Sequence, residues 1–151
     1  MKRDDPDTYF IKMATLVAGR GTCARRRVGC VLVNHRRHVL ATGYNGVAAG
    51  LVHCTDRPCL GASYRSGTGL DKCEAIHAEQ NALLQCRDVY SVHTCYTTLS
   101  PCMHCLKLLL NTSCERIVFD EEYTHNDDPK RLWISAGRDW YGIHEPDEIP
   151  F

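Results

Sequence analysis

The sequence has no long apolar run, no excess of either charge and few aromatic side chains. No stretch approaches the roughly 18 consecutive apolar residues that a membrane-spanning helix requires. Eighteen basic residues balance eighteen acidic ones, and aromatic residues make up 8% of the chain. Proteins that hold long nucleic acid usually carry a basic excess, because phosphate contacts supply most of the affinity. The totals therefore argue against a membrane protein and a binder of long nucleic acid.

The opening segment, Met1 to Phe10, is polar and acidic, which does not fit a secretory signal. We therefore expect a cytoplasmic protein. A chain of 151 residues is long enough to bury a substantial core, and it suits one domain over residues 1–151.

Ten cysteines are many for a chain of this length. In an intracellular protein they favour metal binding over disulfides. Four of them fall within or beside expected helices and strands, away from any ligand-like spacing, and we predict that they are buried as small apolar side chains. These four are Cys30, Cys86, Cys95 and Cys114.

Periodicity, β-branched runs and turn residues predict an alternation of helices and strands. Helices are expected at 8–18, 76–87, 100–111 and 129–136. Strands are expected at 28–33, 39–44, 92–99 and 116–119, and residues 139–143 are a candidate for a last strand. This order predicts an α/β fold with a mixed sheet of four or five strands and helices on both faces. Residues 46–72 lack periodicity, and a loop of that length is usually functional.

Two short strings carry the chemistry, HAE at 77–79 and PCMHC at 101–105. Each lies at the expected N-terminus of a helix. The i, i+3 spacing places Cys102 and Cys105 on one helix face, where both thiolates can reach one metal ion. With His77 they form three protein ligands, and an open fourth position is typical of a catalytic zinc.

Glu79 follows His77 by two residues, so the two side chains cannot point in the same direction along a helix. Its carboxylate is expected beside a water molecule at the open zinc position. That is the place of a general acid and base rather than of a fourth ligand. The combination H-x-E followed by P-C-x-x-C is the signature of zinc deaminases.

With these strings the sequence resembles the cytidine deaminase-like superfamily, and within it the deoxycytidylate deaminases of the phage and bacterial type. The similarity covers about residues 16–123 and includes the string ATGYNG at 41–46. The resemblance implies a three-layer α/β/α sandwich with a mixed sheet of about five strands. It also implies hydrolysis of dCMP to dUMP and ammonia, which supplies dUMP for thymidylate synthesis, with Glu79 passing protons to N3 of the ring and to the departing amine.

The resemblance also suggests how the substrate is held. The backbone at Ala78 and the side chain of Asn45 would contact base and sugar, Tyr123 would lie near them, and Arg26 would bind the 5′ phosphate. Each role has an ordinary alternative. Asn45 precedes a glycine and can be a turn residue. Arg26 belongs to a run of arginines, which can be a solvent-exposed charged surface, and Tyr123 can be a surface tyrosine.

Members of this group bind a second, non-catalytic zinc through cysteines or histidines. By this resemblance we expect four thiolates, with His53 as the substitute if one is absent. The alternative is four unligated thiols in a loop. The four expected ligands are Cys23, Cys54, Cys59 and Cys73.

The same family resemblance implies assembly and regulation. Many deoxycytidylate deaminases are homohexamers that dCTP activates and dTTP inhibits. The effector site would then include the GYNG string, made of Gly43, Tyr44, Asn45 and Gly46.

Two other interpretations share the zinc signature. A deaminase of tRNA or single-stranded DNA would need a basic groove or stacking aromatic side chains, and the composition argues against both. A non-catalytic zinc module that binds a partner would have no use for a carboxylate at the position of Glu79.

Overall fold

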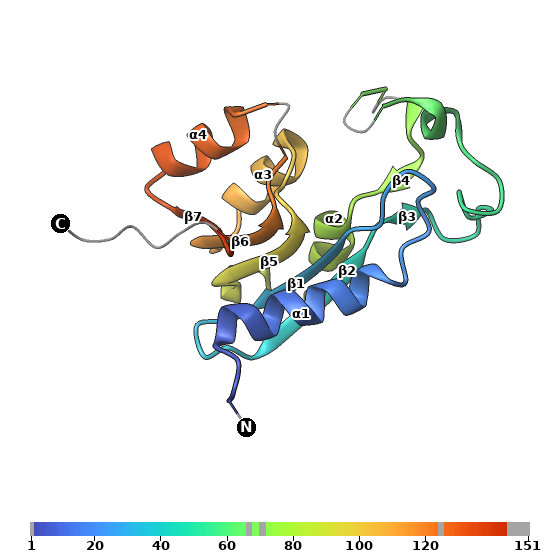
Figure 1. Cartoon of the computed structure of the whole chain (residues 1–151). Coiled ribbons are helices and arrows are strands. Elements are labelled where there is room, and N and C mark those ends of the chain that lie inside the picture. Colours follow the sequence, from blue (N-terminus) through green and yellow to red (C-terminus); the bar gives the residue numbers. More distant parts are fainter. Residues whose placement is uncertain (1, 66–67, 70–71, 124–125, 145–151) are drawn as a thin grey trace.

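A five-stranded mixed sheet forms the centre of the protein (Figure 1). The computed structural model describes residues 2–65, 68–69, 72–123 and 126–144. The strand order is β2-β1-β5-β6-β7, with β1 antiparallel to both neighbours and β5, β6 and β7 parallel. The expected α/β fold with a mixed sheet is thus confirmed. The strands are β1 (Gly29–Val33), β2 (Val39–Tyr44), β5 (Thr94–Leu99), β6 (Arg116–Glu121) and β7 (Asp139–Gly142).

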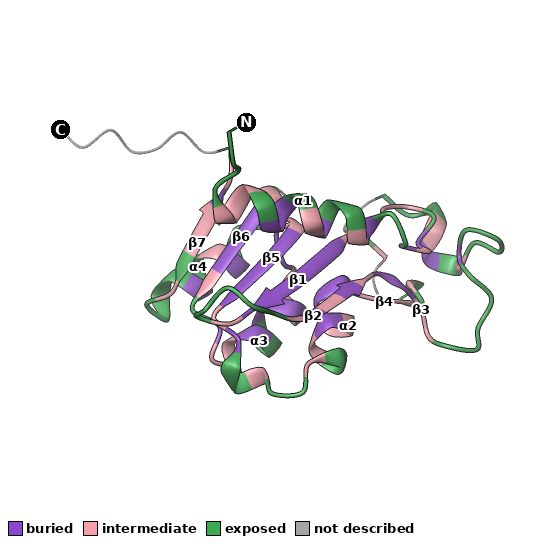
Figure 2. Cartoon of the chain, turned by 90° about the horizontal axis from the view of Figure 1, so that it is seen from below, coloured by how far each residue is buried: buried purple, intermediate pink, exposed green. Residues whose placement is uncertain are grey.

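Helices cover both faces of the sheet, which makes three layers (Figure 2). On one face, α1 (Pro6–Ala18) packs across β1 and β5 with Phe10 and Ala14 in the core. The opposite face carries α2 (Ala78–Gln85), α3 (Met103–Leu110) and α4 (Asp128–Ser135), whose buried side chains join one cluster with the sheet. In the part of the chain that the structure describes, no helix is long and apolar enough to cross a membrane.

Two glycines allow helices to approach the sheet closely. A Cβ atom at Gly29 would lie 1.9 Å from the carbonyl oxygen of Ala14 in α1. A Cβ atom at Gly43 would lie 2.3 Å from both the carbonyl oxygen of Ala78 and the backbone nitrogen of Ala82 in α2. The second contact sets the position of the first turn of α2, and therefore of the site built on it.

A half-buried ionic cluster ties the first turn of α1 to the sheet. The guanidinium of Arg116 donates to Asp7, with Nη2 3.0 Å from Oδ2, and the Tyr96 hydroxyl donates to Asp7 Oδ1 at 2.6 Å. Burial and the neighbouring Asp7 carboxylate raise the pKa of Tyr96. Hydrogen bonds to a charged group are among the stronger ones, so this cluster fixes the position of the start of α1 relative to β5 and β6.

The described residues between β2 and α2 contain more regular structure than their composition predicts. It contains two short strands, β3 (Gly46–Val47) and β4 (Ala75–Ile76), which pair antiparallel. A short 3-10 helix, Leu60–Ser63, lies between them. Strands of two residues contain too little alternation for a periodicity argument to detect.

Several element boundaries differ from the expected ones. Strand β5 begins at Thr94, two residues after the predicted start, and α2 begins at Ala78 with His77 as its N-cap. Helix α3 begins at Met103 with Cys102 as N-cap, so Ser100 is not the cap. The Ser100 hydroxyl instead accepts a 2.6 Å hydrogen bond from the backbone N–H of Tyr123.

Of the four cysteines expected in the core, three are fully buried and one is not. Cys30, Cys95 and Cys114 have no exposed surface. Cys86 is half-buried at the end of α2, where it packs against the edge of the core. The core prediction is therefore correct for three of the four.

Candidate metal centre and active site

The N-termini of α2 and α3 bring three metal-ligand side chains together. His77 and Cys102 occupy the two N-cap positions, and Cys105 lies in the first turn of α3. Nδ1 of His77 is 3.3 Å from the sulfur of Cys105 and 3.5 Å from that of Cys102. All three ligand atoms lie within 4.8 Å of one another, so they can share one tetrahedral metal ion.

The charges of these three residues suit a metal cation. Hydrogen bonding from Cys105, and then from His77, lowers the pKa of Cys102 to about 4. The same hydrogen bond raises the pKa of Cys105, and the Cys102 sulfur raises the pKa of His77. One thiolate is therefore already present, and one nitrogen with two sulfurs is a donor set that zinc prefers.

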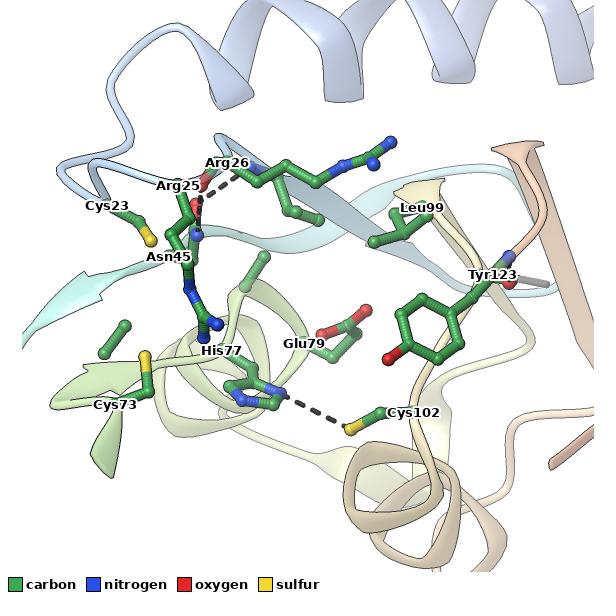
Figure 3. A pocket seen from close by; sticks show the side chains of 14 residues that line it. Cys23, Arg25, Arg26, Asn45, Cys73, His77, Glu79, Leu99, Cys102 and Tyr123 are labelled. Atoms are coloured by element: carbon green, nitrogen blue, oxygen red, sulfur yellow. Dashed lines mark hydrogen bonds between the residues drawn. The ribbon is translucent and has the colours of Figure 1, made fainter. Parts of the chain in front are cut away.

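Glu79 lies next to the ligand cluster and is only 5% exposed. Burial raises the pKa of its carboxyl group, while its own backbone N–H and the Cys105 side chain act in the opposite direction. Figure 3 shows the carboxyl group in the pocket between His77 and Tyr123, above the dashed contact that joins His77 to Cys102. A buried carboxyl group with a raised pKa beside a metal site is suited to carry protons.

Two of the three ligands, His77 and Cys102, line one pocket together with Glu79, and Cys105 lies buried behind them. Every residue expected to hold the substrate lines the same pocket. Arg26, Asn45 and Tyr123 line it (Figure 3), and so does Ala78. Sequence reasoning missed five other lining residues. Of these, Arg25 adjoins Arg26 in the same run and could have been included, whereas the others carry no local signal: Val28, Ala75, Leu99 and Ser100.

Asn45 joins the pocket to the segment before β1. Its side-chain oxygen accepts from the backbone N–H of Val28 at 2.8 Å, and its nitrogen donates to the carbonyl of Arg26 at 2.7 Å. Within the same GYNG string, the carbonyl of Tyr44 accepts a 2.8 Å hydrogen bond from the Asn81 side chain of α2. The string therefore connects β2, α2 and the arginine run around one wall of the pocket.

The two arginines at the pocket have different partners. Nη1 of Arg25 donates to backbone carbonyls beyond the 3-10 helix, at 2.8 Å from Thr68 and 3.3 Å from Arg65. Arg26 forms an exposed ion pair with Glu121 at the end of β6. Arg25 thus ties the long β2–α2 connection to the pocket wall, and Arg26 ties the same wall to the end of β6.

The structure gathers only part of the expected second metal site. The sulfur atoms of Cys54 and Cys59 are 3.7 Å apart, and the Cys59 N–H donates to Cys54 at 3.5 Å. Cys23 and Cys73 line the main pocket. Across the described ranges, three or more ligand atoms come within 4.8 Å of one another only at His77, Cys102 and Cys105.

The sandwich fold and this donor set define a deaminase-like zinc protein, and comparison with known proteins identifies its family. The family model for the cytidine and deoxycytidylate deaminase zinc-binding region matches residues 4–121. The chain belongs to this family. The match begins about twelve residues before the resemblance found in the sequence, which starts near residue 16, and it therefore includes all of α1.

Named relatives cover most of the chain. It is 42% identical over 129 residues to the deoxycytidylate deaminase of Mycobacterium phage D29, covering 81% of this chain and 99% of the phage protein. It is 37% identical over 139 residues to the deoxycytidylate deaminase of Saccharomyces cerevisiae, covering 91% of this chain and 44% of that protein. The chain therefore spans less than half the length of the yeast relative.

The fold has solved counterparts. The dCMP deaminase of cyanophage S-TIM5 in complex with dCMP and dUMP superposes with a TM-score of 0.73 at 22% identity, covering 95% of this chain and all of that one. A tRNA:A34 deaminase superposes with a TM-score of 0.58 at 18% identity. At these identities the likeness establishes the fold.

Proposed function

We propose that this protein is a zinc-dependent deaminase that hydrolyses dCMP to dUMP and ammonia. The observation that carries the proposal is the convergence of His77, Cys102 and Cys105, two of which line a pocket together with the buried carboxyl group of Glu79. Family membership and the names of the relatives support the reaction class and the substrate.

The residues divide the reaction between them. Zinc held by His77, Cys102 and Cys105 would supply a Lewis acid that lowers the pKa of water to near 7. Glu79 would take up the proton that water loses as its oxygen adds to C4 of cytosine, and deliver it to N3. Glu79 would then take the remaining proton from the new C4 hydroxyl and transfer it to the amine as the C4–N bond breaks and C4=O forms, so that one water is consumed and one ammonia is released.

The other lining residues would orient the nucleotide. The backbone of Ala78 adjoins Glu79 and would contact the base, while Asn45 and Tyr123 flank the space available to base and sugar. Because both polar groups of Asn45 already bond to the backbone, it would contact the sugar with its remaining donor and lone pair. Arg26 would bind the 5′ phosphate by exchanging the Glu121 carboxylate for it.

The test is a deamination assay on the zinc-loaded protein with dCMP, deoxycytidine, dCTP and a cytosine-containing single strand. We expect dCMP to be preferred, and Glu79→Gln to abolish turnover while zinc content and dCMP binding are retained. Turnover of the single strand alone would contradict the substrate, and full activity of Glu79→Gln would contradict the mechanism. Arg26→Gln is expected to raise KM for dCMP and leave the weak turnover of deoxycytidine unchanged.

We also propose a second, structural zinc at Cys23, Cys54, Cys59 and Cys73. The Cys54–Cys59 pair supports it, as does the backbone around Cys59. The N–H group of Glu74 chiefly, with those of Gly61 and Ala62, lowers the pKa of the Cys59 thiol, and backbone donors around a thiolate are common at metal sites. Cys23 and Cys73 would have to turn from the pocket toward this pair.

Metal counting tests the second site. Native mass spectrometry and elemental analysis should find two zinc ions per chain, and one in the Cys59→Ser variant. Retention of a single zinc by the unmodified protein would contradict the proposal.

Assembly, regulation and location complete the proposal. By analogy with its family we expect a cytoplasmic homohexamer that supplies dUMP for thymidylate synthesis, with dCTP as activator and dTTP as inhibitor at the GYNG string. Sedimentation with and without each triphosphate, together with rate curves against dCMP, tests this. Hyperbolic curves that ignore both triphosphates would contradict the regulation.

A further inference from the structure

Thr97 is a buried hydroxyl residue beneath the site that no part of the zinc signature includes. It lies on β5 and has no exposed surface. In the sheet it lies between Cys30 of β1 and Phe119 of β6. Both are buried members of the apolar cluster between the sheet and the layer of α2, α3 and α4. A hydroxyl group in such surroundings is costly unless it is hydrogen-bonded, so its hydrogen-bond partners determine whether it stabilises the fold.

The Thr97 hydroxyl has two partners within reach. Its Oγ1 lies 2.8 Å from the carbonyl oxygen of Leu99 and 3.3 Å from Oε1 of Glu79. A threonine hydroxyl has one proton to donate and two lone pairs that can accept. It therefore cannot donate to both oxygens at once, and the two contacts describe alternative directions of one proton.

A hydroxyl at this position can anchor the carboxyl group by donating to it or by accepting from it. When Glu79 is a carboxylate, Thr97 can donate to it. When Glu79 carries a proton, that proton can be donated to Thr97, whose own proton then turns to the carbonyl of Leu99. A valine at this place would fill the same space but could hold the carboxyl group in neither state.

The other contacts of Glu79 do not replace this one. The Cys105 side chain and the backbone N–H of Glu79 itself both adjoin the carboxyl group. Cys105 is a proposed zinc ligand, and its sulfur would then be occupied by the metal. The backbone N–H can only donate, so it supports the carboxylate alone.

We propose that Thr97 is a positioning residue whose buried hydroxyl holds the Glu79 carboxyl group in one place beside the metal ligands. The inference rests on the proposed deamination for its catalytic consequence. Its structural content, a hydrogen bond that fixes the side chain of Glu79, is independent of the substrate.

The matched variants are Thr97→Val, which removes the hydroxyl and keeps the branched shape, and Thr97→Ser, which keeps the hydroxyl. We expect kcat for dCMP to fall roughly 10- to 100-fold in Thr97→Val, the range seen when a group supporting an active-site residue is lost. KM, zinc content and the urea midpoint should stay close to those of the unmodified protein. Thr97→Ser should recover most of the rate, which a role in packing alone would not produce.

Crystal structures of the zinc-loaded variants separate this proposal from the proposed function. The Glu79 side chain should leave its position, or occupy several, in Thr97→Val and remain in place in Thr97→Ser. An unmoved Glu79 in Thr97→Val would overturn the proposal whatever the substrate, as would an unchanged kcat. If the unmodified protein fails to deaminate dCMP, the proposed function is wrong, and the position of Glu79 in the two variants still decides the role of Thr97.

Discussion

Replacing Gly43 by alanine should disable the site from a distance. The added Cβ atom would lie 2.3 Å from the Ala78 carbonyl and the Ala82 nitrogen, whereas ordinary contacts begin at 3.4 Å. Both atoms belong to the backbone of α2 and cannot turn aside like a flexible side chain. Helix α2 must therefore retreat from β2 by about 1 Å, because packed interiors have little free space to absorb the change.

The first turn of α2 carries both His77 and Glu79, so the retreat would move a metal ligand and the proton carrier together. A displacement of about 1 Å in an active site can reduce a rate by about 100-fold. Overpacking itself is expected to destabilise the fold by about 1–3 kcal/mol. We therefore expect Gly43→Ala to lose most of its kcat for dCMP and part of its zinc affinity. It should remain folded at about 25 °C, because the free energy of unfolding of a domain is usually about 5–15 kcal/mol.

Gly29→Ala is the matched control. Its Cβ atom would lie only 1.9 Å from the Ala14 carbonyl, so the steric conflict is at least as severe. That conflict displaces α1, on the opposite face of the sheet from the site. Gly29→Ala should therefore be destabilised by a comparable amount and keep the rate of its folded, zinc-loaded fraction.

The assay measures the initial rate of dCMP deamination per zinc-loaded molecule, with the folded fraction taken from circular dichroism. Unchanged kcat and zinc affinity in Gly43→Ala would refute the reasoning, because the helix would then tolerate the side chain without moving the site. Equal loss of rate in both variants would also refute it, because that result would indicate general destabilisation.

Three further predictions follow from charges and anchoring contacts. Zinc binding near pH 7 should release the proton of Cys105 and part of a proton from His77, because Cys102, with a pKa of about 4, is already a thiolate and the pKa of His77 is raised. Zinc affinity should therefore fall as the pH is lowered through the raised pKa of His77. Calorimetry in buffers of different ionisation enthalpy measures both effects. Asp7→Asn should lower the free energy of unfolding by about 1–3 kcal/mol and leave kcat unchanged, because it weakens the hydrogen bonds to Arg116 and Tyr96. A urea midpoint equal to that of the unmodified protein would contradict the loss of stability. Arg25→Gln should increase cleavage within residues 64–68 by limited proteolysis, because Arg25 holds three carbonyls there, and an unchanged cleavage pattern would argue against that anchoring.

Much of the fold follows from local patterns in the sequence. A β-branched run predicts β1, and the polar turn after it predicts a hairpin with β2. The apolar spacing in residues 8–18 predicts α1. Boundaries near the site were less accurate. At α3, the serine and proline before Cys102 resemble a typical helix start, but the helix begins two residues later with the cysteine as its cap.

The metal ligands and Glu79 could be predicted because they occur in two compact strings. The rest of the pocket depends on contacts between distant segments. Arg25 reaches carbonyls about 40 residues away, and Thr97 of β5 meets Glu79 at the start of α2 only in the folded sheet. No local spacing encodes such pairs, since they arise from the strand order and the close packing of α2 on the sheet.

The placement of the ligands also determines how the protein would respond to losing its metal. His77 lies 25 residues from Cys102 and 28 from Cys105 in the chain. Of the five strands of the central sheet, only β5 lies between His77 and the two cysteines in the sequence. A zinc ion would act as a short-range cross-link between the starts of two neighbouring helices, and it would not join α1, β1 or β2. Chelation should therefore loosen the first turns of α2 and α3 and leave the sheet with its α1 layer intact, so the emptied protein should be reconstituted by adding zinc without refolding.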